Sequence, residues 1–182
     1  MAIYHESGLS LDLPDGLHFR FAELPAYQRL NGQYLKEMDF AWVDGGKLFL
    51  LEVRSYAQII TTLTRADFVP VQGQPRPHRH EALVDKLTDS LLMLLAAWAD
   101  TDYGKSIKAG LPAAARSRLP LKLIVAIELP SNLSVHLSGL RDSLNARLRG
   151  RIALADVRTV ALVDYARLLA HPTFSAFITA QV

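Results

Sequence analysis

MDFAWVDGGKLFLLEVRSY, residues 38–56, predicts a β-hairpin from which the rest of the fold can be worked out. Two strand-like apolar runs, roughly 35–43 and 47–54, flank Gly45-Gly46, a pair that is a favoured two-residue loop between antiparallel strands. With this loop Asp44 pairs with Lys47, and the two residue numbers of every opposed pair have the same sum. The sequence therefore predicts a hairpin with a defined register.

This register brings charged side chains together inside an apolar hairpin. Asp39 falls opposite Glu52, and Glu37 falls opposite Arg54. Side chains alternate along a strand, so all four lie on one face. Directly opposed Cβ atoms are ~4.5–5.5 Å apart, which lets two carboxylates bind one ion. A three-residue loop would instead place Asp39 and Glu52 on opposite faces.

Both faces of the hairpin are expected to be covered. One carries Met38, Phe40, Trp42, Phe49, Leu51 and Val53, and the charged face also carries Ala41, Val43, Leu48 and Leu50. Opposed like charges destabilise a sheet, and a buried unpaired carboxylate costs more still. A divalent cation with oxygen ligands would balance the surplus of acids. The alternative is a cross-strand ion pair of Glu37 with Arg54, with Asp39 and Glu52 solvated near a sheet edge.

The rest of the chain predicts a single domain, 1–182, of the α/β or α+β class. Its mixed central sheet would contain the antiparallel hairpin or meander and carry helices on both faces. The expected strands are 9–13, 17–21, 121–129 and 157–163, and the expected helices are 25–30, 57–68, 81–100, one with a leucine stripe from Leu133 to Leu148, and short ones up to 178. We expect loops at 70–79 and 101–120.

Composition narrows the setting in which the protein works. Hydrophobic residues make up 50% and charged residues 21% of the chain, as in ordinary globular proteins. There is no cysteine, and the N-terminus lacks the layout of a signal peptide. The longest apolar run, 91–99, is far shorter than the ~20 residues that cross a bilayer. We expect a cytoplasmic protein with no membrane partner, whose net charge of +2 permits a nucleic-acid partner.

The spacing of the hairpin acids resembles that of a known superfamily of nucleases. Asp39, twelve intervening residues and then Glu52-Val53-Arg54 are similar to the motif of the PD-(D/E)XK nuclease superfamily. The resemblance implies a restriction-endonuclease-like core: a helix, a three-stranded meander, a helix and a strand, over roughly 17–130. It also implies that Asp39 and Glu52 bind Mg²⁺ (or Mn²⁺), with the Val53 carbonyl completing the shell.

Two residues depart from the family pattern. Met38 stands where proline is common, and Arg54 stands where lysine is expected. Arginine does not release its proton in practice, so it is a poorer base than lysine, although it can still stabilise charge on a phosphate. Lys86, near the start of the long helix, is a candidate replacement for the missing lysine. The alternative places Lys86 on a solvated helix face together with Asp85 and Asp89.

Further basic residues are candidates for contacting nucleic acid. Arg76 and Arg79 belong to a flexible basic loop, and Arg141 and Arg149 share one face of the later helix, which is otherwise interpreted as a solvated face. The pair His78 and His80 in the same loop is a weak metal pattern because no distant partners accompany it.

The leading functional hypothesis is a metal-dependent nuclease that cleaves phosphodiester bonds in DNA or RNA. Asp39 and Glu52 would hold Mg²⁺, and Arg54 or Lys86 would support the developing charge. One alternative is a catalytically inactive PD-(D/E)XK-like fold that serves as a nucleic-acid- or protein-binding module, and a protein partner or a homodimer is compatible with the sequence. Another is an unrelated α/β protein with a structural ion-pair hairpin.

Overall fold

A mixed five-stranded sheet forms the centre of the molecule. The computed structural model describes residues 1–30, 33–57 and 63–181. The strands of the sheet, in spatial order, are β3 (His18–Phe19), β4 (Phe40–Asp44), β5 (Lys47–Ser55), β6 (Leu121–Glu128) and β7 (Ala161–Asp164). β3, β4 and β5 are antiparallel, whereas β6 and β7 run parallel to β5. The predicted mixed α/β class is therefore confirmed.

The β4–β5 hairpin has the predicted register. Asp44 pairs with Lys47, and the ladder continues to the pair of Phe40 with Leu51. Gly45 and Gly46 have φ values of 53° and 71°, the left-handed conformation that a tight hairpin loop requires and that glycine adopts without a steric cost.

The first strand of the hairpin is shorter than predicted. β4 begins at Phe40, so Glu37 is outside the ladder and does not oppose Arg54. The carboxylate of Glu37 accepts a hydrogen bond from the Tyr27 hydroxyl instead. Met38, expected beside Phe40, packs into the core on the opposite side of the sheet, and its backbone N–H donates to Ser90 Oγ at 2.9 Å.

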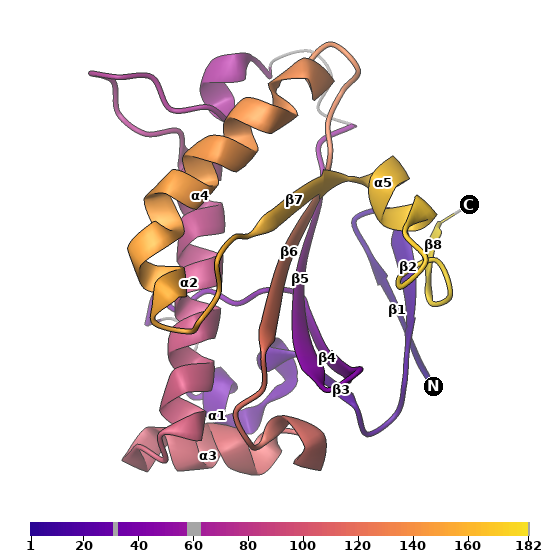
Figure 1. Ribbon diagram of the computed structural model, residues 1–182, viewed down its shortest axis with the longest axis vertical. Helices are drawn as coiled ribbons and strands as arrows, with labels where there is room; N and C mark the ends of the chain where they lie inside the picture. The colour runs from indigo at the N-terminus through magenta and orange to yellow at the C-terminus, as the bar shows by residue number, and fades with distance from the viewer. Residues whose placement is uncertain (31–32, 58–62, 182) are drawn as a thin grey trace.

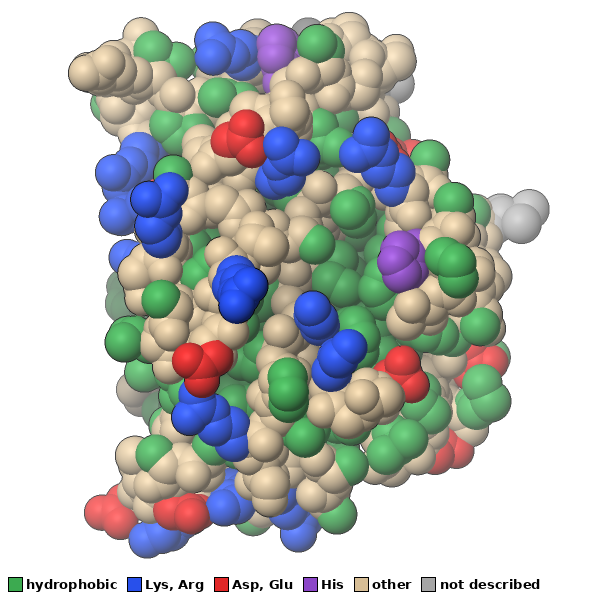
Figure 2. Space-filling model, viewed as in Figure 1, with side chains coloured by type: hydrophobic (Ala, Val, Ile, Leu, Met, Phe, Trp, Pro, Cys, Tyr) green, Lys and Arg blue, Asp and Glu red, His purple; other side chains and the backbone are tan. Residues whose placement is uncertain are grey.

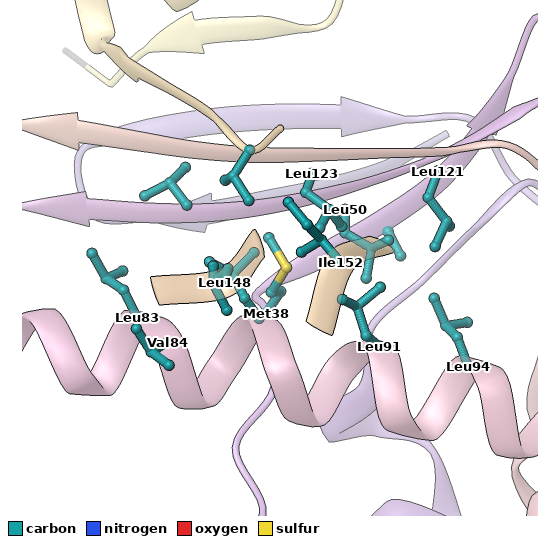
Figure 3. Close-up of a cluster of buried hydrophobic side chains, with 14 of the residues drawn as sticks. Met38, Leu50, Leu83, Val84, Leu91, Leu94, Leu121, Leu123, Leu148 and Ile152 are labelled. Atoms are coloured by element: carbon teal, nitrogen blue, oxygen red, sulfur yellow. The ribbon is translucent and has the colours of Figure 1, made fainter. Parts of the chain in front are cut away.

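A layer of helices covers one face of this sheet. It consists of α1 (Pro25–Gln28), α2 (His78–Trp98), α3 (Asp102–Gly110) and α4 (Leu137–Ala153). Figure 1 shows α2 and α4 running side by side along the sheet, with α1 and α3 at one end. Figure 3 shows the core between these layers, where Leu50 and Leu123 of the sheet face Leu83 and Leu91 of α2. Leu92, within the apolar run 91–99, is 58% exposed because it points away from the sheet.

The other face is covered mainly by a second sheet and by one short helix, α5 (Tyr165–Ala170), so the helices predicted on both faces are divided unequally between them. The second sheet consists of β1 (Ala2–Glu6), β2 (Leu9–Leu13) and β8 (Ile178–Ala180), with α5 beside it. Alternate residues of β2 are buried against the central sheet, where Trp42 and Phe49 stack with ring centroids 5.2 Å apart. The molecule thus has three layers: helices, mixed sheet and small sheet.

Several local predictions also differ from the structure. The chain at 14–17 passes from one sheet to the other and does not join two strands of one sheet. The expected loop 101–120 contains α3, whose first turn is capped by Thr101 Oγ1, 3.0 Å from the Gly104 backbone nitrogen. The helix expected at 57–68 falls partly outside the described residues, and its described end is the 3₁₀ turn Arg65–Asp67. Within the described parts of the chain no helix is long and apolar enough to span a membrane.

Candidate active site

One lysine joins the two carboxylates of the hairpin. Lys86 Nζ lies 3.1 Å from Asp39 Oδ1 and 2.9 Å from Glu52 Oε2. Asp39 immediately precedes β4, Glu52 lies in β5, and Lys86 lies in α2, which packs on the same face of the sheet. Glu52 is fully buried, and the side chains of Asp39 and Lys86 are 11% and 14% exposed. Lys86 is therefore part of a buried cluster and does not lie on a solvated helix face.

The alternation of β5 determines which way its charged residues point. Leu48 and Leu50 belong to the core under the helices, and Glu52 and Arg54 continue the same face toward the end of the strand. The residues between them, including Val53, are buried on the opposite face. Two carboxylates thus enter an apolar helix–sheet interface because the strand register places them there.

Backbone contacts hold Asp39 in position. Its Oδ2 accepts a hydrogen bond from the Val53 N–H at 2.9 Å, which leaves Oδ1 directed to Lys86. Arg20 Nε donates to the Asp39 carbonyl at 3.0 Å. The structure therefore gives the Val53 backbone a positioning contact with Asp39, alongside its expected part as a carbonyl ligand.

Burial dominates the electrostatics of Glu52. Loss of water contact, reinforced by the charge of Asp39, raises the pKa of Glu52 to about 8, although Lys86 and Arg54 oppose that rise. Arg54 Nε lies 2.7 Å from Glu52 Oε1, so this oxygen faces the guanidinium charge, although no described donor is well aligned with it. Each carboxylate oxygen of Glu52 therefore faces a cationic group, Oε1 that of Arg54 and Oε2 that of Lys86.

The donor set matches a hard divalent cation. Asp39 Oδ1 and Glu52 Oε2 already converge on one cationic group, and Glu52 Oε1 faces a second one, the guanidinium of Arg54. Carboxylate oxygens are the ligands that Mg²⁺ and Mn²⁺ prefer. In the described part of the chain no group of three or more acidic or histidine side chains gathers into a metal site. The pair would therefore need backbone, water or substrate oxygens to complete a coordination shell, and Lys86 would have to leave its present position.

The predicted nucleic-acid contacts fall into two groups. Arg79 lies over the rings of Tyr56 and Phe68, at 5.6 and 6.0 Å from their centroids, and Tyr56 follows Arg54 by two residues, so Arg79 is on the side of the site. Arg76 lies near the start of α2, 3.8 Å from Glu81.

The other two predicted contacts are on α4 and do not join the site. Arg141 pairs with the neighbouring Asp142, and Arg149 is exposed. Figure 2 shows lysine and arginine side chains spread singly over the face that carries α4 and β7. This distribution agrees with the alternative of a solvated face for Arg141 and Arg149.

Sequence reasoning missed three positioning residues. Arg20 and Ser90 fix the backbone on either side of the carboxylate of Asp39, through its own carbonyl and through the Met38 N–H. Tyr27 removes Glu37 from the cluster. Ser90 had a weak signal, because it lies four positions after Lys86 and so on the same face of the helix, directly before the apolar run 91–99. The contacts of Arg20 and Tyr27 depend on tertiary packing alone.

Comparisons of the chain with protein-family models, with curated proteins and with solved structures find no match.

Proposed function

We propose that this protein is a metal-dependent nuclease that hydrolyses phosphodiester bonds in DNA or RNA. The observation that carries the proposal is the convergence of Asp39 and Glu52 on a single cationic group inside a buried helix–sheet interface. Structural ion pairs also bury charges, but two carboxylates directed at one point form the minimal ligand pair for a catalytic divalent ion.

The order of elements supports a PD-(D/E)XK-like core. The antiparallel set β3–β4–β5 is followed by α2 and by β6, which lies parallel to β5, and the acids lie at β4 and β5 as the resemblance implies. One feature departs from the pattern, since the short α1 falls between β3 and β4 instead of before the meander.

Each charged side chain would have a distinct task. When bound, Mg²⁺ or Mn²⁺ would supply Lewis-acid charge at the scissile phosphate and a water of lowered pKa. Asp39 and Glu52 would hold the ion. Lys86 would move from the carboxylates toward the substrate, where its ammonium could orient the attacking water or donate a proton. Arg54, 35% exposed, would remain a fixed positive charge that stabilises the phosphate oxygens.

The position of Lys86 explains how an arginine can follow Glu52 and Val53. In the family pattern a lysine is expected at the position of Arg54. Lys86 brings an ammonium to within 2.9 Å of Glu52 from α2, so the site does not lack a lysine. Lys86 on α2 would thus take the role that the family motif gives to a lysine on the strand.

A second candidate function, a non-catalytic binding module, is favoured by one observation. Two acids and two bases balance one another in the cluster, since Lys86 and Arg54 both approach Glu52 and Lys86 also reaches Asp39. A balanced network of this kind would be stable without a metal.

Cleavage of labelled single- and double-stranded DNA and RNA separates the two candidates. We expect cleavage with Mg²⁺ or Mn²⁺, none with EDTA, and a loss of at least about 100-fold in Asp39→Asn, because that variant removes a ligand charge while its shape is kept. Asp44→Asn is the matched control, since Asp44 is exposed at the turn end of the same strand.

Substitution of Arg54 provides an independent test in the same cleavage assay. Arg54→Lys should keep or raise the cleavage rate, because it restores the usual residue of the family. Absence of metal-dependent cleavage of all four substrates, with a folded protein, would favour the binding module.

A further inference from the structure

A second polar cleft lies at the beginning of α2, away from the carboxylates. Its volume is about 430 Å³, and it is lined by Pro70, Arg76, His80, Ser143, Ala146 and Arg147. It therefore lies between the loop that precedes α2, the first turn of α2 and the middle of α4. The backbone N–H groups in the first turn of α2 carry the partial positive charge of a helix N-terminus, and no side chain caps them.

Among the described residues, three buried polar atoms in or beside this cleft have no hydrogen-bond partner. They are His80 Nδ1, Glu81 Oε1 and Arg147 Nε. His80 is only 1% exposed, and its Nε2 is 2.9 Å from Ser143 Oγ. In the tautomer with the proton on Nδ1, the Nδ1–H faces Glu81 Oε1 at 3.5 Å, a distance too long for a strong hydrogen bond. Arg147 Nε is a buried donor for which no described residue supplies an acceptor. Unpartnered buried donors are rare in folded proteins, and a ligand with acceptor oxygens would satisfy this one.

The charged side chains around the cleft have a net charge of +1. Glu81 lies 3.8 Å from Arg76 Nη1 and 3.7 Å from Arg147 Nη2, both longer than hydrogen bonds. His80 Nδ1 is 3.5 Å from the same carboxylate. Two arginines against one glutamate give a surplus of one positive charge, with histidine neutral. A phosphodiester, with one negative charge and several acceptor oxygens, fits both the surplus and the unused donors.

The cleft and the proposed active site are both formed in part by α2. His80 and Lys86 lie on the same helix, so six residues of helical rise, about 9 Å, separate them along the α2 axis. The same six residues turn the helix by about 240°, so His80 is directed to α4 and Lys86 to the carboxylates. A strand that reaches both places must therefore follow the surface over more than one nucleotide.

We propose that the cleft binds a backbone phosphodiester of the nucleic-acid strand at a distance from the scissile position, held by Arg76, Arg147 and His80. The proposal rests on the proposed function, since it takes the ligand to be a nucleic-acid strand. Binding is separable from chemistry, because it requires no metal.

The test is binding of a short fluorescein-labelled oligonucleotide in EDTA, followed by fluorescence anisotropy. Arg147→Gln and Arg76→Gln should each weaken binding about tenfold and lower the slope of the salt dependence by about one, as expected for the loss of one phosphate contact. Glu81→Gln should tighten binding, because it removes the competing carboxylate. A purely structural role of these residues would not produce this opposite sign. Arg158→Gln, at an exposed arginine beyond α4, is the charge-matched control and should bind as the wild type does.

The possible results are distinguishable. Equal binding by the wild type and by both cleft arginine variants, all with unchanged melting temperatures, would overturn the proposal whether or not the protein cleaves. Displacement of the oligonucleotide by an equal concentration of inorganic phosphate would overturn the assignment to a strand and identify a site for free phosphate. Absence of cleavage together with cleft-dependent binding would overturn only the nuclease activity.

Discussion

At the scale of single residues, Lys86 is the counter-ion that makes the carboxylate pair tolerable in the absence of metal. Its Nζ is within 3.1 Å of both acids, and all three side chains are largely buried. At a pH above about 8, where Glu52 is ionised, Lys86→Met should therefore lower the free energy of unfolding by about 3–5 kcal/mol in EDTA, because two buried carboxylates would lose their partner. Urea unfolding measures this effect.

Lys36→Met is the control for the Lys86 substitution. Lys36 pairs with Asp85 at 2.7 Å, but both side chains are more than 40% exposed. Exposed pairs contribute little, so the loss should be below about 1 kcal/mol. Added Mg²⁺ should restore part of the stability of the Lys86 variant and none in the Lys36 variant. Equal losses in the two variants would show that Lys86 is not the counter-ion of the pair.

Glu52 should make the stability depend on pH in the direction opposite to an ordinary ion-paired acid. Its pKa is raised to about 8 in the folded protein, from an ordinary value of 4.5. Between these values the folded state holds a proton that the unfolded state has released, so stability falls as pH rises from about 5 to about 8. Glu52→Gln cannot titrate and should remove this part of the decline.

Thermal unfolding of the wild type and of Glu52→Gln at several pH values tests this effect. The melting temperature of Glu52→Gln should rise relative to that of the wild type as the pH increases from about 5 to about 8. A constant difference would contradict a raised pKa at Glu52.

At the scale of secondary-structure elements, the hairpin was predictable and its surroundings were less so. The Gly45-Gly46 loop fixes the register as far as the pair of Phe40 with Leu51 and so sets the face of Glu52. Asp39 lies just beyond this ladder, and its hydrogen bonds with the Val53 N–H and Lys86 hold it on the same side. The strand's start was not predictable, because Met38 and Glu37 leave the ladder for contacts with Ser90 and Tyr27 that only the tertiary structure creates.

The second sheet and α3 show the limits of pattern analysis. β1 has alternating exposure with no fully buried residue, so its apolar signal is weak. α3 contains two glycines and begins at a Thr101 cap inside an Ala- and Arg-rich segment that otherwise resembles a loop. The contact of Lys86 was a candidate from its place near the start of the long helix. Its distances to both acids follow from the packing of α2 on the sheet, which periodicity does not specify.

The contact between α2 and α3 gives a prediction at the element scale. A Cβ added at Gly104 of α3 would lie 2.0 Å from the Ala96 carbonyl oxygen of α2. This oxygen is a backbone atom, so no change of side-chain rotamer can relieve the clash. Gly104→Ala should therefore force the helices apart and destabilise the protein by at least about 1–3 kcal/mol.

Gly150→Ala in α4 is the matched substitution for this comparison. Nothing lies within 4 Å of its added Cβ, so the better helix propensity of alanine should stabilise the protein by about 0.5–1 kcal/mol. Chemical denaturation measures the expected loss of stability in Gly104→Ala and the expected gain in Gly150→Ala. A neutral Gly104→Ala would show that the helices are not packed this closely.

At the scale of the whole molecule, the candidate site forms where the helical layer packs on the central sheet. The sheet supplies Asp39, Glu52 and Arg54, and the helical layer supplies Lys86 from α2. The small sheet contributes no charged group to this face, and instead covers the opposite face, where Val53 and Phe49 are buried. Any movement of α2 on the sheet would change the distance between ammonium and carboxylates, so metal binding is expected to be coupled to the packing of this helix.

The central claim is that Asp39 and Glu52 bind a divalent cation at the point that Lys86 reaches in the metal-free protein. Anomalous diffraction from crystals grown with Mn²⁺ tests it most directly, with Asp39→Asn crystals as the control. We predict an anomalous peak between the two carboxylates at roughly 2.0–2.5 Å from their oxygens, the range of metal–oxygen bonds. We also predict that Lys86 Nζ has withdrawn from both acids and that the peak is lost in Asp39→Asn. A map without a peak at that position, with Lys86 still bridging Asp39 and Glu52 in the presence of Mn²⁺, would contradict the claim.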